Sequence, residues 1–362
     1  MWETKEACSG FSSFTVTTDA VYITGKKGDT DVLTAFNQSG KKLWEVPYGK
    51  ASDSNYPDSR STATYANGKL FVVSGEGDMV CISTSGKIIW SVNYFKNYGA
   101  SAPRFGISES PLVTGNLVIG TPGGSKASVV AFDVNTGKVE WETPSLNEGT
   151  QYVNPLYVEN KGVKMLVTVT TRSVIAVRLS DGKLLWKYDY ESLNSQIGGR
   201  RNHTNTPLYR DGSLLVMNGY TQVAVKLKLN GENEPVAEWK NSDLTPHVGG
   251  AVLLGNLIFS STHDTNSSGR WICVDWTSGK TLWINDWHNK GPIISADGML
   301  YIMEEKTGNV ALVKPSSSKL DVVSKFRITK GNGPYWAHPV ISRGRLFIRH
   351  GEYLAVYSVE AK

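Results

Sequence analysis

Short apolar segments separated by turns run through the whole chain. Segments such as residues 69–73 and 78–83 are rich in β-branched side chains and are bounded by Gly, Asn, Asp or Ser. This pattern predicts β-strands joined by tight turns. No segment combines helical periodicity with helix caps. We therefore expect an all-β protein.

A recurring hairpin that ends in tryptophan divides the chain into repeats. Five copies read SGKKLW, SGKIIW, TGKVEW, DGKLLW and SGKTLW, and a sixth, more divergent copy begins at Asn230-Gly231. The six copies end at Trp44, Trp90, Trp141, Trp186, Trp239 and Trp283. The glycine occupies a turn position that requires a positive φ. Successive tryptophans are 44 to 53 residues apart, and a period in this range is typical of solenoids and propellers.

The tryptophan lies on the fourth strand of each unit, and three more strands precede it. The third strand has a small residue at its centre: Ala35, Cys81, Ala131, Ala176, Ala224, Cys273, Ala311 and Ala355. The second strand often opens with Gly-x-Leu, as at Gly68-Lys69-Leu70, and the first often begins with proline, as at Pro111. Proline is tolerated at the first residue of a strand because its missing N–H lies outside the ladder. Four short strands per repeat indicate a blade of a β-propeller.

The repeats predict a single domain, residues 1–362, folded as an eight-bladed β-propeller of four-stranded antiparallel blades. The expected blades are residues 14–48, 61–95, 109–145, 153–190, 204–243, 247–287, 290–329, and 336–362 together with 1–6. Blade seven lacks the tryptophan, and we expect Phe326 in its place. Blade eight stops before its fourth strand, whereas residues 1–6 resemble such a strand and carry Trp2. We therefore predict that the N-terminal strand pairs into the last blade and closes the ring, which removes exposed sheet edges.

The hairpin with its small-residue strand resembles the pyrroloquinoline quinone (PQQ) type propeller repeat. Stretches such as DSRSTATYANGKLFVVSGEGDMVCIS and PYWAHPVISRGRLFIRH are also similar to PQQ-like proteins. The resemblance covers nearly the whole chain. It implies a relationship to two groups, the eight-bladed quinoprotein alcohol dehydrogenases and non-catalytic BamB-type propellers. Both groups are periplasmic or secreted, so the resemblance implies the same location here.

Composition and charge exclude several classes of protein. The 362 residues include 38 Lys and Arg against 33 Asp and Glu, a formal net charge of +5. The charges form no block of one sign, so the sequence lacks the usual footprint of a nucleic-acid-binding protein. No run of 18 apolar residues exists, which excludes a transmembrane segment of that kind. Three cysteines do not provide a disulfide framework.

Cofactor binding is an expectation that follows from the resemblance alone. The quinoprotein dehydrogenases carry a vicinal Cys-Cys pair over PQQ, whereas Cys8, Cys81 and Cys273 are isolated, and C-x-x-C-H is absent too. Family members hold calcium with a Glu, an Asn and an Asp, and Glu109 and Asn154 lie where such ligands would be sought. PQQ with calcium is therefore a candidate cofactor that the missing cysteine pair argues against.

The loops that lead into the blades carry the candidate site. In a propeller the first strand of each blade lines the central channel, so the loop before it, here called the lead-in loop, faces one mouth of that channel. His203, His247 and His288 occupy the same position in three successive lead-in loops, and His338 lies in that of blade eight. We expect a ligand-binding mouth that also includes Arg60, Arg104, Glu109, Asn154, Arg201, Trp287 and Trp336.

Three interpretations of this mouth stay open. His203, His247 and His288 would hold a divalent metal as neutral imidazoles. Alternatively, arginine and tryptophan would hold an anionic or carbohydrate ligand through bidentate and stacking contacts. In the third interpretation the residues only bond neighbouring backbone.

These observations favour a non-catalytic binding or scaffold protein of the cell envelope, with a small molecule or a protein as partner. The alternative is a PQQ-dependent dehydrogenase that oxidises an alcohol or a sugar. No catalytic residue is assigned, because the chain has no G-x-S-x-G, P-loop or H-E-x-x-H motif. Met1 directly precedes a strand inside a blade, so we expect the natural chain to begin upstream, with a secretion signal.

Overall fold

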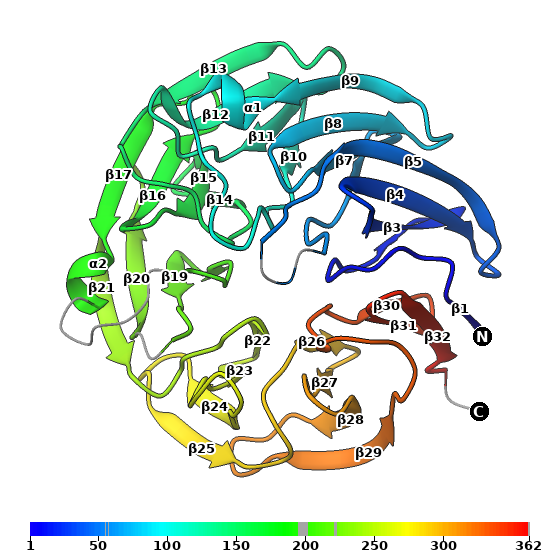
Figure 1. Cartoon of the computed structure of the whole chain (residues 1–362). Coiled ribbons are helices and arrows are strands. Elements are labelled where there is room, and N and C mark those ends of the chain that lie inside the picture. Colours follow the sequence, from blue (N-terminus) through cyan, green and yellow to red (C-terminus); the bar gives the residue numbers. More distant parts are fainter. Residues whose placement is uncertain (55, 57, 195–201, 221–222, 361–362) are drawn as a thin grey trace.

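The computed structural model describes residues 1–54, 56, 58–194, 202–220 and 223–360, whose strands form eight four-stranded antiparallel sheets around a common axis (Figure 1). Blades one to four contain, from the axis outwards, β2 (Thr15–Val16), β3 (Ala20–Lys27), β4 (Thr30–Asn37) and β5 (Lys42–Lys50); β6 (Thr64–Ala66), β7 (Lys69–Val73), β8 (Asp78–Ser83) and β9 (Ile88–Asn93); β10 (Leu112–Thr114), β11 (Leu117–Gly120), β12 (Ala127–Asp133) and β13 (Val139–Pro144); β14 (Leu156–Asn160), β15 (Val163–Val169), β16 (Ser173–Arg178) and β17 (Leu184–Asp189). The prediction of an eight-bladed, all-β propeller is confirmed.

The second half of the ring repeats this arrangement. Blades five to eight contain β18 (Leu208–Arg210), β19 (Ser213–Val216), β20 (Ala224–Asn230) and β21 (Asn233–Asn241); β22 (Ala251–Leu254), β23 (Leu257–Ser261), β24 (Trp271–Asp275) and β25 (Thr281–Asn285); β26 (Ile293–Ala296), β27 (Met299–Met303), β28 (Asn309–Lys314) and β29 (Asp321–Arg327); β30 (Val340–Ser342), β31 (Arg345–His350), β32 (Tyr353–Ser358) and β1 (Trp2–Thr4). Short helices α1 (Tyr94–Asn97) and α2 (Glu191–Asn194) follow β9 and β17. No helix in the described part of the chain has the length and apolar character that a membrane span requires.

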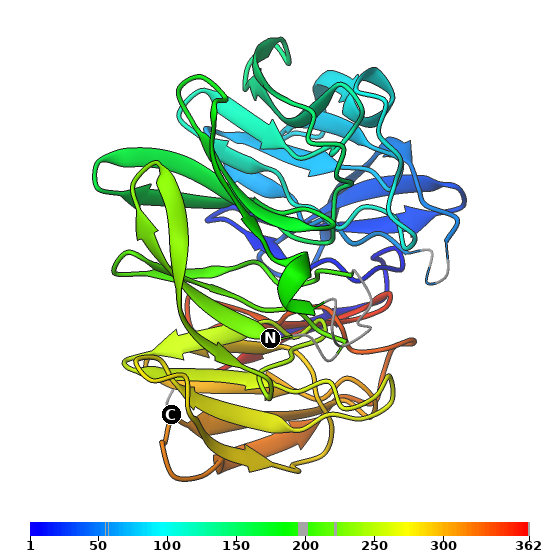
Figure 2. The ribbon, with the colours of Figure 1, turned by 90° about the vertical axis from the view of Figure 1, so that its left-hand side faces the viewer.

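The antiparallel order assigns every loop to one of two faces. Lead-in loops and the loops between second and third strands lie on one face, and the hairpin turns between third and fourth strands lie on the other. In the side view the green hairpins project to the left and α2 lies to the right of them (Figure 2). The candidate site and the tryptophan-bearing turns are therefore on opposite faces.

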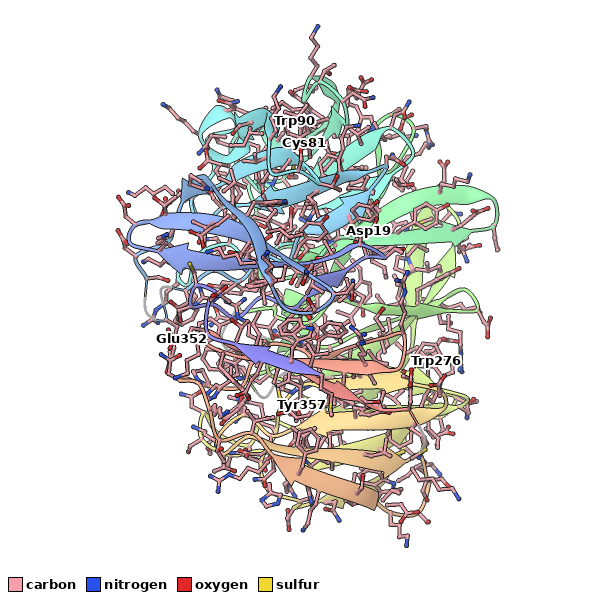
Figure 3. All side chains as sticks on the ribbon, turned by 90° about the vertical axis from the view of Figure 1, so that its right-hand side faces the viewer. Asp19, Cys81, Trp90, Trp276, Glu352 and Tyr357 are labelled. Carbon is pink, nitrogen blue, oxygen red and sulfur yellow. The ribbon has the colours of Figure 1, made fainter. Side chains whose placement is uncertain are left out.

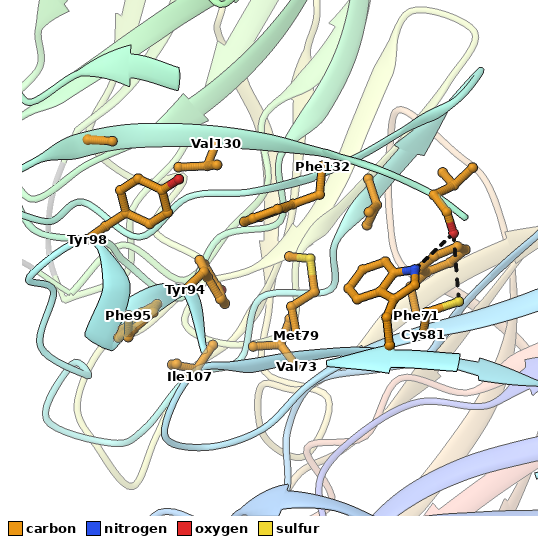
Figure 4. Close-up of a cluster of buried hydrophobic side chains, with 14 residues drawn as sticks. Phe71, Val73, Met79, Cys81, Tyr94, Phe95, Tyr98, Ile107, Val130 and Phe132 are labelled. Atoms are coloured by element: carbon orange, nitrogen blue, oxygen red, sulfur yellow. Dashed lines mark hydrogen bonds between the residues drawn. The ribbon is translucent and has the colours of Figure 1, made fainter. Parts of the chain in front are cut away.

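Each blade buries both faces of its middle strands against its neighbours. In β12, Val130 and Phe132 pack against blade two, beside Phe71 and Met79 (Figure 4). The alternate residues of β12, such as Ala131, pack against blade four. A strand that is buried on both faces has an apolar run instead of an alternating pattern, which explains the sequence of the middle strands.

The repeated tryptophans join neighbouring blades. Opposite the tryptophan lies the small residue of the third strand, as in the pairs Ala35–Trp44 and Cys81–Trp90. Each indole N–H reaches a backbone carbonyl in the next blade's hairpin, and Trp90 donates to the Val134 carbonyl at 3.1 Å. The other donors are Trp2, Trp44, Trp141, Trp239 and Trp283, at 2.9–3.1 Å. The Trp186 N–H is the exception and has no hydrogen-bond partner among the described residues.

The hairpin glycines accommodate these indoles. Gly137 has φ +68°, and a Cβ on it would lie 2.7 Å from the Trp90 ring, whereas Gly231 has φ +62° and open space around it. Gly231→Ala should therefore lower the free energy of unfolding by about 1 kcal/mol through backbone strain alone. Gly137→Ala should lower it by about 2–3 kcal/mol, because the indole must also move. Urea unfolding measures both values, and equal losses would contradict a role of the glycine in holding the tryptophan.

Two expectations about the repeat positions were wrong. In blade five Lys226, not Ala224, lies opposite Trp239. The stem of this buried lysine fills the small-residue position, and its ammonium lies 4.6 Å from the centre of the Trp276 ring and 3.2 Å from a Glu238 carboxylate oxygen. A long hairpin with two register shifts moves the pairing by two residues.

In blade seven Lys325, not Phe326, lies opposite Ala311. Phe326 pairs with Val310 and is 40% exposed. Its ring packs 5.2 Å from that of Tyr357 in blade eight, so it contacts the next blade without occupying the tryptophan position. The bulge between Leu312 and Val313 sets this register.

The N-terminal strand closes the ring, as predicted. β1 pairs with β32, with Trp2 opposite Val356, and runs beside the strand that carries Tyr357 in Figure 3. The Trp2 indole packs on Gly40 of blade one and donates to the Gln38 carbonyl at 3.1 Å. Both termini therefore belong to one blade.

Candidate functional site

A collar of hydrogen bonds surrounds the channel where the first strands begin. The residue before each first strand's proline position donates its N–H to a side-chain oxygen of the next blade. The links are Ser13 to Thr62 at 2.9 Å, Thr62 to Ser110 at 3.0 Å, Ser110 to Asn154 at 2.7 Å and Asn154 to Thr206 at 3.2 Å. This collar fixes the radius of the channel across blades one to five.

His338 completes the collar on the other side. The equivalent positions in blades six and seven are Gly250 and Gly291, and a Cβ on Gly250 would lie 3.5 Å from the His338 ring. His338 belongs to blade eight, and its Nε2 lies 3.0 Å from the Gly249 carbonyl in blade six. Its own carbonyl accepts a hydrogen bond from the Ser13 hydroxyl at 2.7 Å. Asn154 and His338 are therefore collar residues as well as lining residues.

A cavity of about 760 Å³ extends from the collar to the lead-in loops. Five of the expected site residues line it: Arg60, Asn154, His247, Trp336 and His338. Hydroxyl and amide side chains account for much of the rest, among them Ser108, Asn202, Thr204, Asn205 and Asn266. None of the described residues that line it is Asp or Glu. The size lies within the range of small-molecule sites.

Aromatic rings cover two parts of the wall. Trp336 lies 5.1 Å from Phe11 and 4.9 Å from Tyr56 between ring centres, and the Arg60 guanidinium lies 5.5 Å from the Phe11 ring. Phe105 and Tyr152 form a second pair, 6.1 Å apart. The Trp336 indole N–H donates to Glu305 at 2.9 Å, behind the wall. These contacts hold the rings as fixed surfaces against which a ligand can stack.

A third aromatic group contains two histidines. The His247 ring lies 4.5 Å from that of His263, and its Nε2 lies 2.9 Å from the Tyr220 hydroxyl. Burial, followed by the charges of His263 and Lys290, lowers the pKa of His247 to about 3. His247 is therefore uncharged at neutral pH.

The other expected site residues lie away from the cavity. His203 is buried beside Tyr190, and burial lowers its pKa to about 4. His288 is exposed and stacks by its edge on Trp287, which packs into the core of blades six and seven. Arg104 is exposed over the Phe105 ring. Arg201 lies outside the described residues.

The three histidines expected to share a metal do not converge. His203 is in the protein interior, His247 bonds Tyr220, and His288 faces solvent near Asn309. Over residues 1–194, 202–220 and 223–360, leaving out 55 and 57, no three His, Cys, Asp or Glu side chains are placed to hold a metal ion. The three histidines occupy the same position of the sequence repeat, but their side chains are buried to different extents. They are therefore not neighbours in the structure.

Glu109 is a buried structural carboxyl. It is 1% exposed and accepts the Thr121 N–H at 3.0 Å as well as the Thr121 hydroxyl. Burial raises its pKa from the usual 4.5 to about 7, against the lowering effect of the Thr121 hydrogen bonds. It is absent from the cavity wall.

The raised pKa of Glu109 predicts how stability depends on pH. Between pH 4.5 and 7 the unfolded chain releases this proton while the folded chain keeps it, so stability falls as pH rises, by about 3 kcal/mol for this group. Glu109→Gln should remove that part of the decline. Burial also raises the pKa of Asp31 to about 7. The stability of the variant should therefore still decline as pH rises, but by less than that of the wild type. Chemical unfolding at pH 5 and pH 8 tests this, and parallel pH profiles for the two proteins would refute it.

The residues present do not fit PQQ with calcium. The cavity wall provides no carboxylate among the described residues, and Asn154 already accepts the Ser110 N–H. Cys81 and Cys273 are buried in separate blades, and Cys8 lies 3.9 Å from Glu45, so no two cysteines are adjacent. Calcium requires several oxygen ligands, usually including carboxylates, and the described residues of this wall include no carboxylate.

Several lining residues were not expected from the sequence. Phe11, Phe105 and Tyr152 are in lead-in loops, and Tyr220 and Asn266 are in loops between second and third strands. The second group could have been found, because an antiparallel four-stranded blade places both kinds of loop on the same face. The aromatic residues of the lead-in loops carried no periodic signal of their own.

Eight four-stranded blades, joined by tryptophans packed on hairpin glycines, define a propeller of the PQQ type. The chain belongs to the family described as outer membrane protein assembly factor BamB, which matches residues 28–285. Among solved structures, BamB from Moraxella catarrhalis has a TM-score of 0.70 at 12% identity and covers 99% of this chain and 98% of that one. Quinohemoprotein alcohol dehydrogenase ADHIIG from Pseudomonas putida HK5 has a TM-score of 0.66 at 13% identity, over 100% of this chain and 76% of that one. These likenesses concern the fold.

Sequence relatives are quinone-dependent alcohol dehydrogenases. The dehydrogenase subunit from Komagataeibacter europaeus is 31% identical over 115 residues, and that from Gluconobacter oxydans is 30% identical over the same length. These matches span 28% of this chain and 15% of the relatives' length.

Proposed function

We propose that this is a non-catalytic binding or scaffold protein of the cell envelope, which holds a small molecule or part of a protein partner at its channel mouth. One observation carries the proposal: the cavity of about 760 Å³ has a wall of fixed aromatic rings, hydroxyls and amides without a carboxylate among its described residues. Such a wall offers binding contacts, and its described residues include no carboxylate to act as an acid, a base or a metal ligand.

The envelope location is supported by the family. Its description names an outer membrane protein assembly factor. A protein of that family would be exported, and its ring, closed by its own terminal strand, would leave no open sheet edge for pairing with other chains.

Binding at the mouth can be tested without knowing the ligand. We expect native mass spectrometry or a thermal-shift screen of small metabolites to find a compound that stabilises the wild type but not Trp336→Ala. Trp287→Phe, outside the cavity, is the matched control and should respond like the wild type. A compound that stabilises all three proteins equally would count against the channel mouth as the site.

The dehydrogenase alternative has its own test, supported by the relatives of 30–31% identity. PQQ and calcium are added to the full chain, and dye-linked oxidation of ethanol and glucose is measured. We expect no turnover above that of PQQ alone. Turnover that Asn154→Ala abolishes would replace the proposed function with that of a quinoprotein.

A further inference from the structure

The cavity wall contains a buried acceptor without a donor. Asn205 is 2% exposed, and its amide nitrogen donates to the Pro246 carbonyl at 2.8 Å and the His247 carbonyl at 3.2 Å. Because carbonyls only accept, these bonds fix the orientation of the amide. Its Oδ1 has no partner among the described residues. An acceptor in this position requires an O–H or N–H from a ligand or water.

Two other buried polar atoms of wall residues also lack a hydrogen-bond partner among the described residues. The Ser108 hydroxyl of blade three and the His247 Nδ1 of blade six have no partner within the described residues. A hydroxyl can donate or accept, and a neutral imidazole nitrogen does one or the other. Together with Asn205 in blade five, they belong to three side chains that line the same cavity, and the three atoms themselves are buried in its wall.

The charge of the wall argues against an anion as the main ligand. Arg60 is the one Lys or Arg among the described residues of the wall. It already donates to the backbone carbonyls of Asp58, at 3.1 Å, and Tyr56. A carboxylate or phosphate has no hydrogen to give to Asn205 Oδ1, so it would leave that acceptor unsatisfied.

The aromatic surfaces complete the match to one chemical class. The Trp336 group and the Phe105–Tyr152 pair are apolar faces beside these polar atoms. A pyranose has hydroxyls around its edge, which both donate and accept, and a C–H face that packs on aromatic rings. We propose that the cavity binds a neutral carbohydrate, with its ring on Trp336 and its hydroxyls on Ser108, Asn205 and His247. This deepens the proposed function and rests on it.

Ser108→Ala is the sharpest variant, because this hydroxyl has no hydrogen-bond partner among the described residues and its loss should not affect folding. The full chain is titrated by calorimetry and saturation-transfer NMR with glucose, galactose, N-acetylglucosamine, cellobiose and maltose. At least one sugar should bind saturably, and Ser108→Ala should raise its Kd by about 3- to 10-fold. Ser61→Ala is the matched control, since its buried hydroxyl also lacks a partner among the described residues but lies outside the cavity. It should leave the Kd unchanged.

Trp336 tests the stacking surface separately. Trp336→Ala should raise the sugar Kd by at least about 10-fold, whereas Trp336→Phe, which keeps a ring, should stay within about 3-fold of the wild type. Sugar binding that neither Ser108→Ala nor Trp336→Ala weakens would refute the assigned site.

Anionic probes separate this inference from the proposed function. Glucuronate and benzoate are titrated in parallel. If no neutral sugar binds but an anion or a screened metabolite binds in a Trp336-dependent manner, the carbohydrate inference fails and the binding function stands. If no probe or screened compound depends on Trp336 or Ser108, both fail.

Discussion

Replacing Arg349 with methionine should lower the free energy of unfolding by about 3–5 kcal/mol. Arg349 is fully buried in β31 of blade eight, and burial lowers its pKa to about 9. Its guanidinium donates to the carbonyls of Cys8 at 2.7 Å and Thr24 at 2.7 Å in the N-terminal segment and blade one. Further bonds reach Ser12 and Gly351. Methionine fills the volume but removes the guanidinium donor from these buried carbonyls, at about 1–3 kcal/mol for each that is left unpaired and that water does not reach.

Because of the location of Arg349, its replacement should weaken mainly the contacts that close the ring. Arg349 connects the last blade to the segment that follows β1, next to the point where β1 pairs with β32. Arg349→Met should therefore increase hydrogen exchange in residues 2–12 more than in blades three to five. Arg345→Met is the matched control, because Arg345 lies on the same strand, is half-buried, and its side chain has one hydrogen bond to the described residues, to the Gln38 carbonyl at 2.9 Å. Equal losses in the two variants, measured by urea unfolding, would contradict the closure role.

The fold could be predicted because its information is local and repeated. The glycine of each hairpin, the tryptophan after it and the apolar middle strands specify the same four-stranded unit again and again, and Trp2 revealed the closure. The strand register was harder to predict, because a β-bulge inserts a residue without a recognisable sequence pattern. That is why Lys226 replaced Ala224 opposite Trp239 and why Phe326 missed the position opposite Ala311.

The site was less predictable, because it depends on depth as well as on repeat position. His203 and His247 share a position in the sequence repeat, yet one side chain points into the core beside Tyr190 and the other into the cavity. Arg349 gave no signal at all, since most of its partners are backbone carbonyls, and those of Cys8 and Thr24 are far away in sequence. Hydrogen bonds to carbonyls leave no pattern of residue types.

Removing the Glu305 carboxylate should also destabilise the fold by about 3–5 kcal/mol. Lys290 and Glu305 form an ion pair at 3.2 Å with side chains 1% and 3% exposed. Burial raises the pKa of Glu305 and lowers that of Lys290. In Glu305→Ala the Lys290 ammonium stays buried, and its remaining hydrogen bonds to the described residues are those to the carbonyls of Thr265 and Ser268. A buried charge that loses its partner is strongly destabilising.

Comparison variants separate the charge from the packing. Asp321→Ala removes the acid of a surface pair with Lys319, whose side chains are 38% and 68% exposed, and should change stability by less than about 1 kcal/mol. The double variant Lys290→Met/Glu305→Leu should recover much of the loss, because it removes both charges together. A double variant no more stable than Glu305→Ala would assign the loss to packing instead.

Glu305 also links this pair to the cavity. Its Oε2 accepts the Trp336 indole N–H at 2.9 Å, so the carboxylate that neutralises Lys290 also fixes the ring on which a ligand would stack. Glu305→Gln keeps an acceptor for the indole while it removes the negative charge, whereas Glu305→Ala removes both. We therefore expect both variants to lose stability but only Glu305→Ala to lose ligand affinity markedly, by about 3- to 10-fold. Equal loss of affinity in the two variants would show that charge, rather than the held ring, acts on the cavity.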